Sequence, residues 1–175
     1  MRAIVIGCSI LLLAMLAVST SVASPREIQV DVTSIAAATR PVSASERGKA
    51  TVELDPRLGS FSKNLRALFA YDSYTFLNKD RDAVEFGAAA VFNLPDHLFI
   101  EVAPEQLGRD GSDMIEMLVT LFREEPRGEG GRERRTPERE VILRTKIRLK
   151  NGGTVLLGGP PISGGVLVLA LTARG

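Results

Sequence analysis

The chain has 175 residues, of which 45% are hydrophobic and 25% charged, and its formal net charge is +1. This composition is that of a globular protein, and the balanced charge argues against a general nucleic-acid binder, which carries a basic excess. One histidine, one cysteine and no tryptophan leave little for a Ser-His-Asp triad, a multi-histidine or cysteine metal site, or an aromatic sugar-binding platform. We therefore expect no enzyme of these classes and no cofactor.

The first 23 residues have the three-part layout of a secretory signal peptide. Arg2 gives a positive start, residues 3–18 are almost all apolar, and the small residues Ser21 and Ala23 suit signal peptidase. We expect cleavage after Ala23. The apolar run is shorter than the roughly 20 residues of a membrane span, so we expect no transmembrane span after cleavage.

The predicted mature chain is a single β-rich domain, residues 24–175. Loss of Arg2 brings its formal net charge to zero, and loss of Cys8 leaves it without cysteine. Its stability must then come from packing and strand pairing, not from a disulfide. We expect an exported protein, periplasmic or associated with the outer membrane of a Gram-negative bacterium.

The first half of this domain predicts a strand, a connector and a helix. Ile28, Val30 and Val32 alternate with polar residues, which predicts a strand over residues 26–35 with one buried face. Residues 36–50 are small and polar and predict a flexible connector, followed by a short strand at 51–54. Asp55-Pro56 is a typical helix start. The spacing of four apolar residues predicts a helix over residues 56–70 that packs on a sheet, namely Leu58, Phe61, Leu65 and Leu68.

Strand patterns follow the helix. We predict a strand at residues 71–77 that ends in a turn at 78–82, and an alternating strand at 84–92. Pro95-Asp96 indicates a tight turn, and residues 98–102 form the return strand of a hairpin. Residues 114–122 are apolar on both faces apart from two positions.

The C-terminal part combines a charged segment with three strands. Residues 123–140 contain arginines and glutamates but no bulky apolar residue, which predicts a long mobile loop. Residues 141–150 alternate, Asn151-Gly152 is a strong signal for a hairpin turn with positive φ at both residues, and residues 166–171 predict a central strand covered on both sides. The predicted fold is mainly β: an antiparallel sandwich or curled sheet of eight or nine strands with one amphipathic helix.

Four cations on one strand face form the best candidate site, which we call the basic ladder: Arg144, Lys146, Arg148 and Lys150. Alternate side chains lie roughly 6–7 Å apart along a strand, so the basic ladder is suited to an acidic protein, a phosphate-bearing lipid or an anionic polymer. The alternative is a solvated sheet face, with acids such as Glu116 compensating the charge. Exposed cations also protect an edge strand from aggregation.

Two weaker chemical hypotheses remain. Asp96-His97 has the residue types of a partial metal site, although a surface turn explains it equally well. A carboxylate pair such as Glu101 with Glu116 would suit glycoside hydrolysis if the separation were right.

Residues 149–160 (LKNGGTVLLGGP) resemble a stretch of the bacterial secretins, the outer-membrane gate proteins of type II and III secretion and of type IV pili. In that family a strand, a glycine-containing turn and a threonine with apolar residues precede a Gly-Gly pair. The similarity extends over residues 141–172. Secretins are much longer and assemble from many copies, so no functional residue is carried over. The resemblance implies either a place in an envelope assembly or a shared hairpin.

These observations lead to three functional hypotheses. The first is a non-enzymatic envelope protein that binds another protein, as an accessory to a secretion or pilus assembly, through its strand edges. The second is a binding module for an anionic envelope polymer or lipid. The third is a small carboxylate-based hydrolase.

Overall fold

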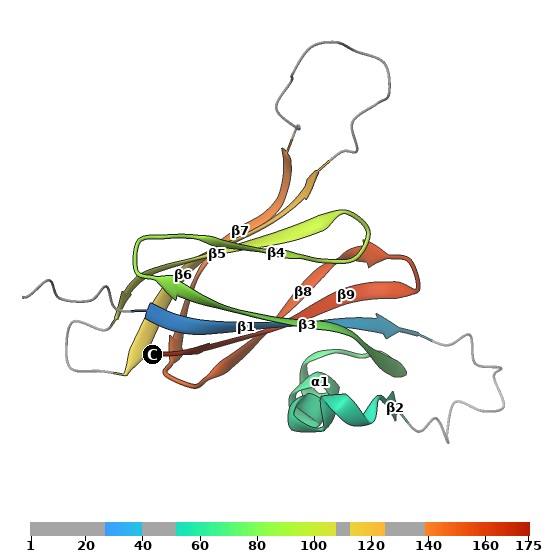
Figure 1. Cartoon of the computed structure of the whole chain (residues 1–175). Helices are drawn as coiled ribbons and strands as arrows, with labels where there is room; N and C mark the ends of the chain where they lie inside the picture. The colour runs from blue at the N-terminus through green and yellow to red at the C-terminus, as the bar shows by residue number, and fades with distance from the viewer. Residues whose placement is uncertain (1–26, 40–51, 108–112, 125–138) are drawn as a thin grey trace, which may run out of the picture.

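The computed structural model describes residues 27–39, 52–107, 113–124 and 139–175. These residues form two packed sheets and one helical segment (Figure 1). Sheet A has the strand order β2-β3-β1-β9-β8, and sheet B has the order β4-β5-β6-β7. The elements are β1 (Glu27–Ala38), β2 (Glu53–Leu54), a 3₁₀ turn (Pro56–Phe61), α1 (Ser62–Leu68), β3 (Ser73–Glu85), β4 (Ala90–Asn93), β5 (Leu98–Leu107), β6 (Met114–Glu124), β7 (Arg139–Lys150), β8 (Thr154–Ile162) and β9 (Gly165–Arg174). Paired strands are antiparallel except β2 and β3.

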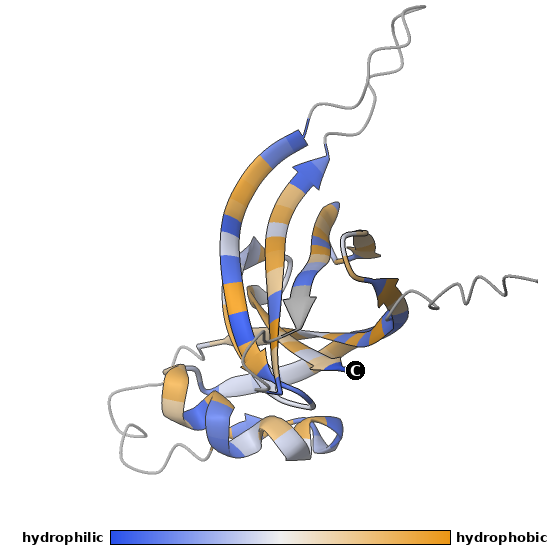
Figure 2. Ribbon diagram, turned by 90° about the vertical axis from the view of Figure 1, so that its left-hand side faces the viewer, coloured by the Kyte–Doolittle hydropathy of each residue, from blue (hydrophilic) through white to orange (hydrophobic). Residues whose placement is uncertain are grey.

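The predicted fold class is therefore confirmed. One of the sheets is strongly curled, and the arched strands β6 and β7 are seen in Figure 2. The predicted signal peptide, residues 40–50 of the predicted connector and residues 125–138 of the predicted loop lie outside the described residues.

The main core lies between the two sheets, where alternate side chains of both are buried. Ile28, Val30 and Val32 point into it from β1, as the alternation predicted. The strand is longer than expected, because it continues through Ala38. Residues 36–38, assigned to the connector from the sequence, are thus part of sheet A. They remain in the strand because β3 and β9 pair with β1 on both sides.

A second core lies between the outer face of sheet A and the helical segment. Leu58 and Leu65 are fully buried there against β1, β3 and β9. Asp55 caps the segment by accepting a hydrogen bond from the Arg57 backbone N–H at 3.0 Å, as its position before Pro56 predicted. The predicted continuous helix is a 3₁₀ turn followed by a short α-helix.

Leu68, which the predicted stripe expected to be buried, is 65% exposed. It is the last residue of α1, because Phe69 is already extended with φ −128° and ψ 136°, so the buried stripe of the helical segment ends at Leu65.

The predictions for residues 78–92 are wrong in two respects. Residues 78–82 are not a turn, because β3 runs through them and pairs with β1 along its length. The chain turns instead at residues 86–87, where Gly87 has a φ of 85°, and β4 begins only at Ala90. Pairing with a central strand outweighs the local turn propensity of the charged residues.

The two-residue hairpin turn is found at Asp96-His97, between β4 and β5. Both residues have positive φ, 58° and 57°, and Leu98 N–H donates to the Pro95 carbonyl at 3.2 Å. This is the geometry of a type I′ turn. The tight turn predicted at Pro95-Asp96 is confirmed.

The hairpin predicted at Asn151-Gly152 is wrong. Gly152 has a φ of 76°, whereas Asn151 is not among the residues with positive φ, and Gly153 N–H donates to the Lys150 carbonyl at 2.7 Å. These features match a type II turn. The turn carries the chain from β7 in sheet B to β8 in sheet A, so β8 pairs with β9 and not with β7.

Tertiary contacts hold this corner. The Asn151 side-chain amide donates to the Gly175 carbonyl at 3.1 Å and accepts from the Gly175 N–H at 3.0 Å. The segment that resembles secretins, residues 141–172, is consequently divided between the two sheets.

Candidate functional site

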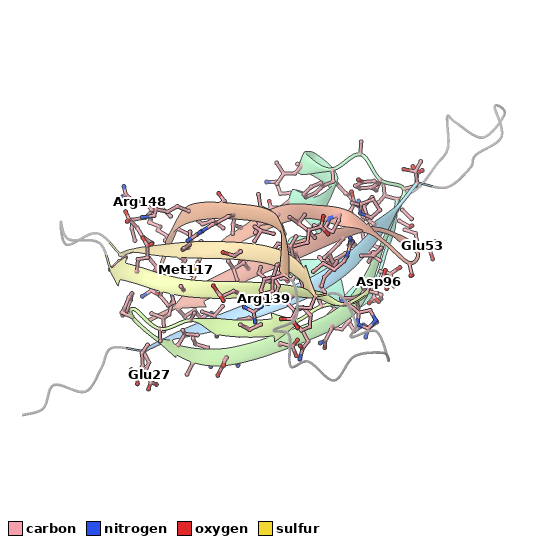
Figure 3. The ribbon with its side chains drawn as sticks, turned by 90° about the horizontal axis from the view of Figure 1, so that it is seen from above. Glu27, Glu53, Asp96, Met117, Arg139 and Arg148 are labelled. Carbon is pink, nitrogen blue, oxygen red and sulfur yellow. The ribbon has the colours of Figure 1, made fainter. Side chains whose placement is uncertain are left out.

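The basic ladder lies on the solvent face of β7. All four of its side chains are exposed, whereas Ile147 and Leu149 between them are each 7% exposed and face the core. The structure thus brings Arg144, Lys146 and Arg148 into one row with Lys150, as the alternation predicted. Arg148 and Arg139, near opposite ends of β7, are labelled in Figure 3.

Two of the four cations are compensated by acids of neighbouring strands. Lys146 Nζ lies 2.5 Å from an oxygen of Glu105 on β5, and the hydrogen bond and charge of Glu105 raise the pKa of Lys146. Arg148 donates from Nε and Nη2 to Glu116 on β6. Glu116 itself is only 9% exposed. The compensation by Glu116 that the sequence suggested is therefore present.

Arg144 and Lys150 differ from these two. Within the described ranges, neither forms an ion pair with an acidic side chain. Arg144 is paired across the sheet with Thr120 and Lys150 with Met114. The charge available to a partner is therefore concentrated at two positions of the basic ladder.

β7 is also the last strand of sheet B. In the part of the chain that the structure describes, β6 is its only hydrogen-bonded neighbour, and the first half of β7 rises with β6 beyond the body of the two sheets (Figure 1). An edge strand presents unpaired backbone N–H and C=O groups, which an incoming strand can pair with.

Two apolar side chains are exposed at this free edge. Val141 is 57% exposed and Ile142 is 37% exposed, beside an irregularity in the β6–β7 register between Leu121 and Phe122. The register pairs Phe122 with Val141 and Leu121 with Leu143, so Ile142 is the extra residue of a β-bulge. The sequence signal for these exposed residues was the adjacent apolar pair Val141-Ile142 at the start of an otherwise alternating strand. The sequence-based prediction did not use this signal.

Aromatic packing supports the strands at this point. The rings of Phe99 on β5 and Phe122 on β6 stack with centroids 5.5 Å apart. The Arg139 guanidinium lies 4.6 Å from the Phe122 ring centroid and donates to Glu124 at 2.9 Å. Residues 123–124 and 139–140, assigned to the mobile loop from the sequence, are ends of β6 and β7.

An open depression of about 610 Å³ lies at the β4–β5 turn and is lined by Asn93, Leu94, Asp96, His97 and Phe99. Asp96 accepts hydrogen bonds from the backbone N–H and the hydroxyl of Ser163, at 2.5 and 3.2 Å. Its carboxylate thus joins sheet B to the β8–β9 turn of sheet A. Among the described residues, no group of three or more His, Cys, Asp or Glu side chains is arranged to hold a metal ion.

A buried acid on sheet A was missed by sequence reasoning. Asp31 on β1 is 4% exposed, and its carboxylate lies 2.5 Å from Arg81, 3.6 Å from Lys79 and 3.9 Å from Arg174. Burial raises the pKa of Asp31, but the Arg81 hydrogen bond and the three positive charges outweigh burial and hold this pKa below its ordinary value. The cluster joins β1, β3 and β9.

The carboxylate pair suggested for hydrolysis is not a pair of available groups, because Glu116 is engaged by Arg148. Among the described residues, β7 combines a strand edge without a second neighbour with a row of exposed cations.

Neither helical segment of the described residues has the length and apolar character of a membrane-spanning helix. Comparison of the chain with protein-family models, with curated proteins and with solved structures finds no significant match.

Proposed function

We propose that this chain is a non-enzymatic exported envelope protein that binds another protein, as an accessory to a secretion or pilus assembly. Export is supported by the signal-peptide layout of residues 1–23, and the machinery by the resemblance of residues 149–160 to secretins. The observation that carries the proposal is the free edge of β7, with exposed Val141 and Ile142 beside Arg144.

Binding would occur by β-augmentation. A partner strand laid along β7 takes up its outward-facing backbone groups and covers Val141 and Ile142, which gives affinity. The basic ladder contributes mainly orientation and association rate, because Lys146 and Arg148 already have acidic neighbours and exposed charges are screened by salt.

The test is the size and composition of the complex that the tagged chain forms in mildly solubilised envelopes, measured by native gel and co-purification. We expect a large assembly with the native chain and its loss in V141K/I142K, which places two charges at the contact. The matched control is V91K, since Val91 is 47% exposed on β4, the opposite edge strand of sheet B. An assembly that both variants retain, or a free monomer with the native chain, would contradict the proposal.

One observation favours the second candidate function, a module for an anionic envelope polymer or lipid. Arg144 and Lys150 lack acidic partners among the described residues, so an anionic polymer could contact both. This function needs no protein partner. The purified chain would then sediment with cell-wall or lipopolysaccharide preparations at low salt, and R144Q/K150Q would remain in the supernatant.

A further inference from the structure

We infer that the free edge of β7 selects an extended acidic segment of a different protein, with an acid and an apolar residue two positions apart, and not a second copy of this chain. This inference rests on the proposed function and specifies the partner of the same edge.

A second copy is disfavoured by the pattern of the basic ladder. From residue 143 to residue 150, every outward-facing position is a cation. Any antiparallel register that aligns this stretch with its counterpart, apolar face to apolar face, therefore places cations opposite cations. Like charges directly opposite one another destabilise a strand pair.

A register centred on Ile142 does not escape this problem. Glu140 is the acid nearest to Arg144 along β7, but the bulge places them on opposite faces: Glu140 pairs with Arg123, and Arg144 with Thr120. Residues 123 and 120 of β6 have opposite parity and point to opposite sides of the sheet. A second copy therefore cannot bring Glu140 against Arg144.

An acidic strand matches the same edge. Arg144 is exposed and has no acidic partner among the described residues, whereas Lys146 is neutralised by Glu105. A carboxylate opposite Arg144 gains a charge-assisted contact at a point where no described strand other than β6 pairs with the backbone of β7. An additional acid opposite Lys146 adds less binding energy, because Lys146 already forms an ion pair with Glu105.

The spacing in the partner follows from β6. On β6, Phe122 lies opposite Val141 and Thr120 lies opposite Arg144, two residues apart, because Ile142 is accommodated as a bulge. A regular strand on the other edge of β7 meets the same two-residue spacing. A partner antiparallel to β7 thus carries an acid followed two positions later by an apolar residue, so that the acid faces Arg144 and the apolar side chain covers Val141.

The test uses two fluorescent ten-residue peptides of alternating threonine and valine. In the first, glutamate and phenylalanine are two positions apart and share one face. In the second, they are adjacent and fall on opposite faces. Binding to the full chain is measured by fluorescence anisotropy at low and at physiological salt.

We expect the first peptide to bind about tenfold more tightly than the second, which corresponds to about 1.4 kcal/mol. R144E should remove this preference. The matched control K63E, the same charge change at an exposed position on α1, should retain it. Equal affinity of the two peptides, or a preference that survives R144E, would overturn the inference.

Two further outcomes separate this inference from the proposed function. If neither peptide binds while the envelope complex still depends on Val141 and Ile142, the partner has another chemistry, and only the inference fails. If light scattering shows a dimer of the purified chain that V141K/I142K dissociates, the occupant is a second copy, which also overturns the inference.

Discussion

The turn between β4 and β5 stores backbone strain that a single substitution should release. Asp96 and His97 both adopt left-handed backbone conformations, with φ of 58° and 57°. This conformation costs a residue with a Cβ roughly 1–2 kcal/mol, a cost that glycine does not have. Asp96 is held by Ser163, so His97 is the residue to change, and we predict that His97→Gly stabilises the protein.

The expected magnitude is a difference of two effects. Glycine removes about 1–2 kcal/mol of strain from the folded state. It also increases the conformational entropy of the unfolded chain, which lowers the unfolding free energy by about 0.4–1 kcal/mol. The net gain in unfolding free energy therefore lies between about 0 and 1.6 kcal/mol, with a central value of about 0.8 kcal/mol. For a chain of this size, that gain raises Tm by roughly 1–4 °C.

Urea unfolding followed by circular dichroism measures this difference. His97→Ala is the control, because alanine retains a Cβ and hence the strain, so it should give no gain. The reasoning is refuted if His97→Gly lowers the unfolding free energy, or if His97→Ala raises it by an equal amount.

Three further predictions concern the cores and the buried acid. Gly165→Ala should destabilise the protein by about 1–3 kcal/mol or more, because Gly165 has a φ of 147° and a Cβ there would overlap a backbone carbonyl of β1. Gly59→Ala is the control, because a Cβ at Gly59 meets open space and should not destabilise the protein. Urea unfolding measures the unfolding free energy of both variants. Tyr74→Phe should cost about 1 kcal/mol and accelerate amide exchange in α1, since the Tyr74 hydroxyl donates to the Phe69 carbonyl at 2.8 Å; unchanged exchange would contradict this role. Asp31→Asn should destabilise the protein at pH 7 by about 1–2 kcal/mol, a value reduced because the three cations around Asp31 are about half exposed. Because folding lowers the pKa of Asp31, the stabilisation by its carboxylate is complete above the ordinary value of 3.8 and is lost as the pH falls through the lowered pKa. The unfolding free energies of the native chain and of Asp31→Asn, measured against pH, should therefore converge in acid.

The sequence determined the fold class and most strand faces through short-range periodicity. Alternation identified the side chains of β1 that face the main core and the outward cations of β7, because a strand inverts its face at every residue. It did not predict that the other face of β1 is also buried, at Asp31 and Thr33, or that Val141 is exposed on β7. The uniformly apolar residues 166–171 identified β9 as a central strand, which lies between β1 and β8. Asp55-Pro56 marked the start of the helical segment, because capping is a local interaction.

Tertiary structure decided what depends on residues far apart in the chain. The charged residues 78–82 form a strand because β1 pairs with them, and Arg81 there neutralises Asp31, 50 residues away. Asn151-Gly152 has the composition of a hairpin turn, but contacts with Gly175 fix it as a corner between the sheets. Local propensity for a turn is weak compared with the pairing of a whole strand.

The same division applies to the candidate site. The sequence located the basic ladder on one face of β7, since that requires only period-two spacing. Glu105 on β5 and Glu116 on β6 compensate two cations of the basic ladder. Only the tertiary structure shows which cations these are, because other strands bring the two acids beside β7. The exposed edge with Val141 also appeared only in the structure, because an edge is defined by the absence of a neighbouring strand among the described residues, and strand order is set by long-range pairing that local sequence patterns do not encode.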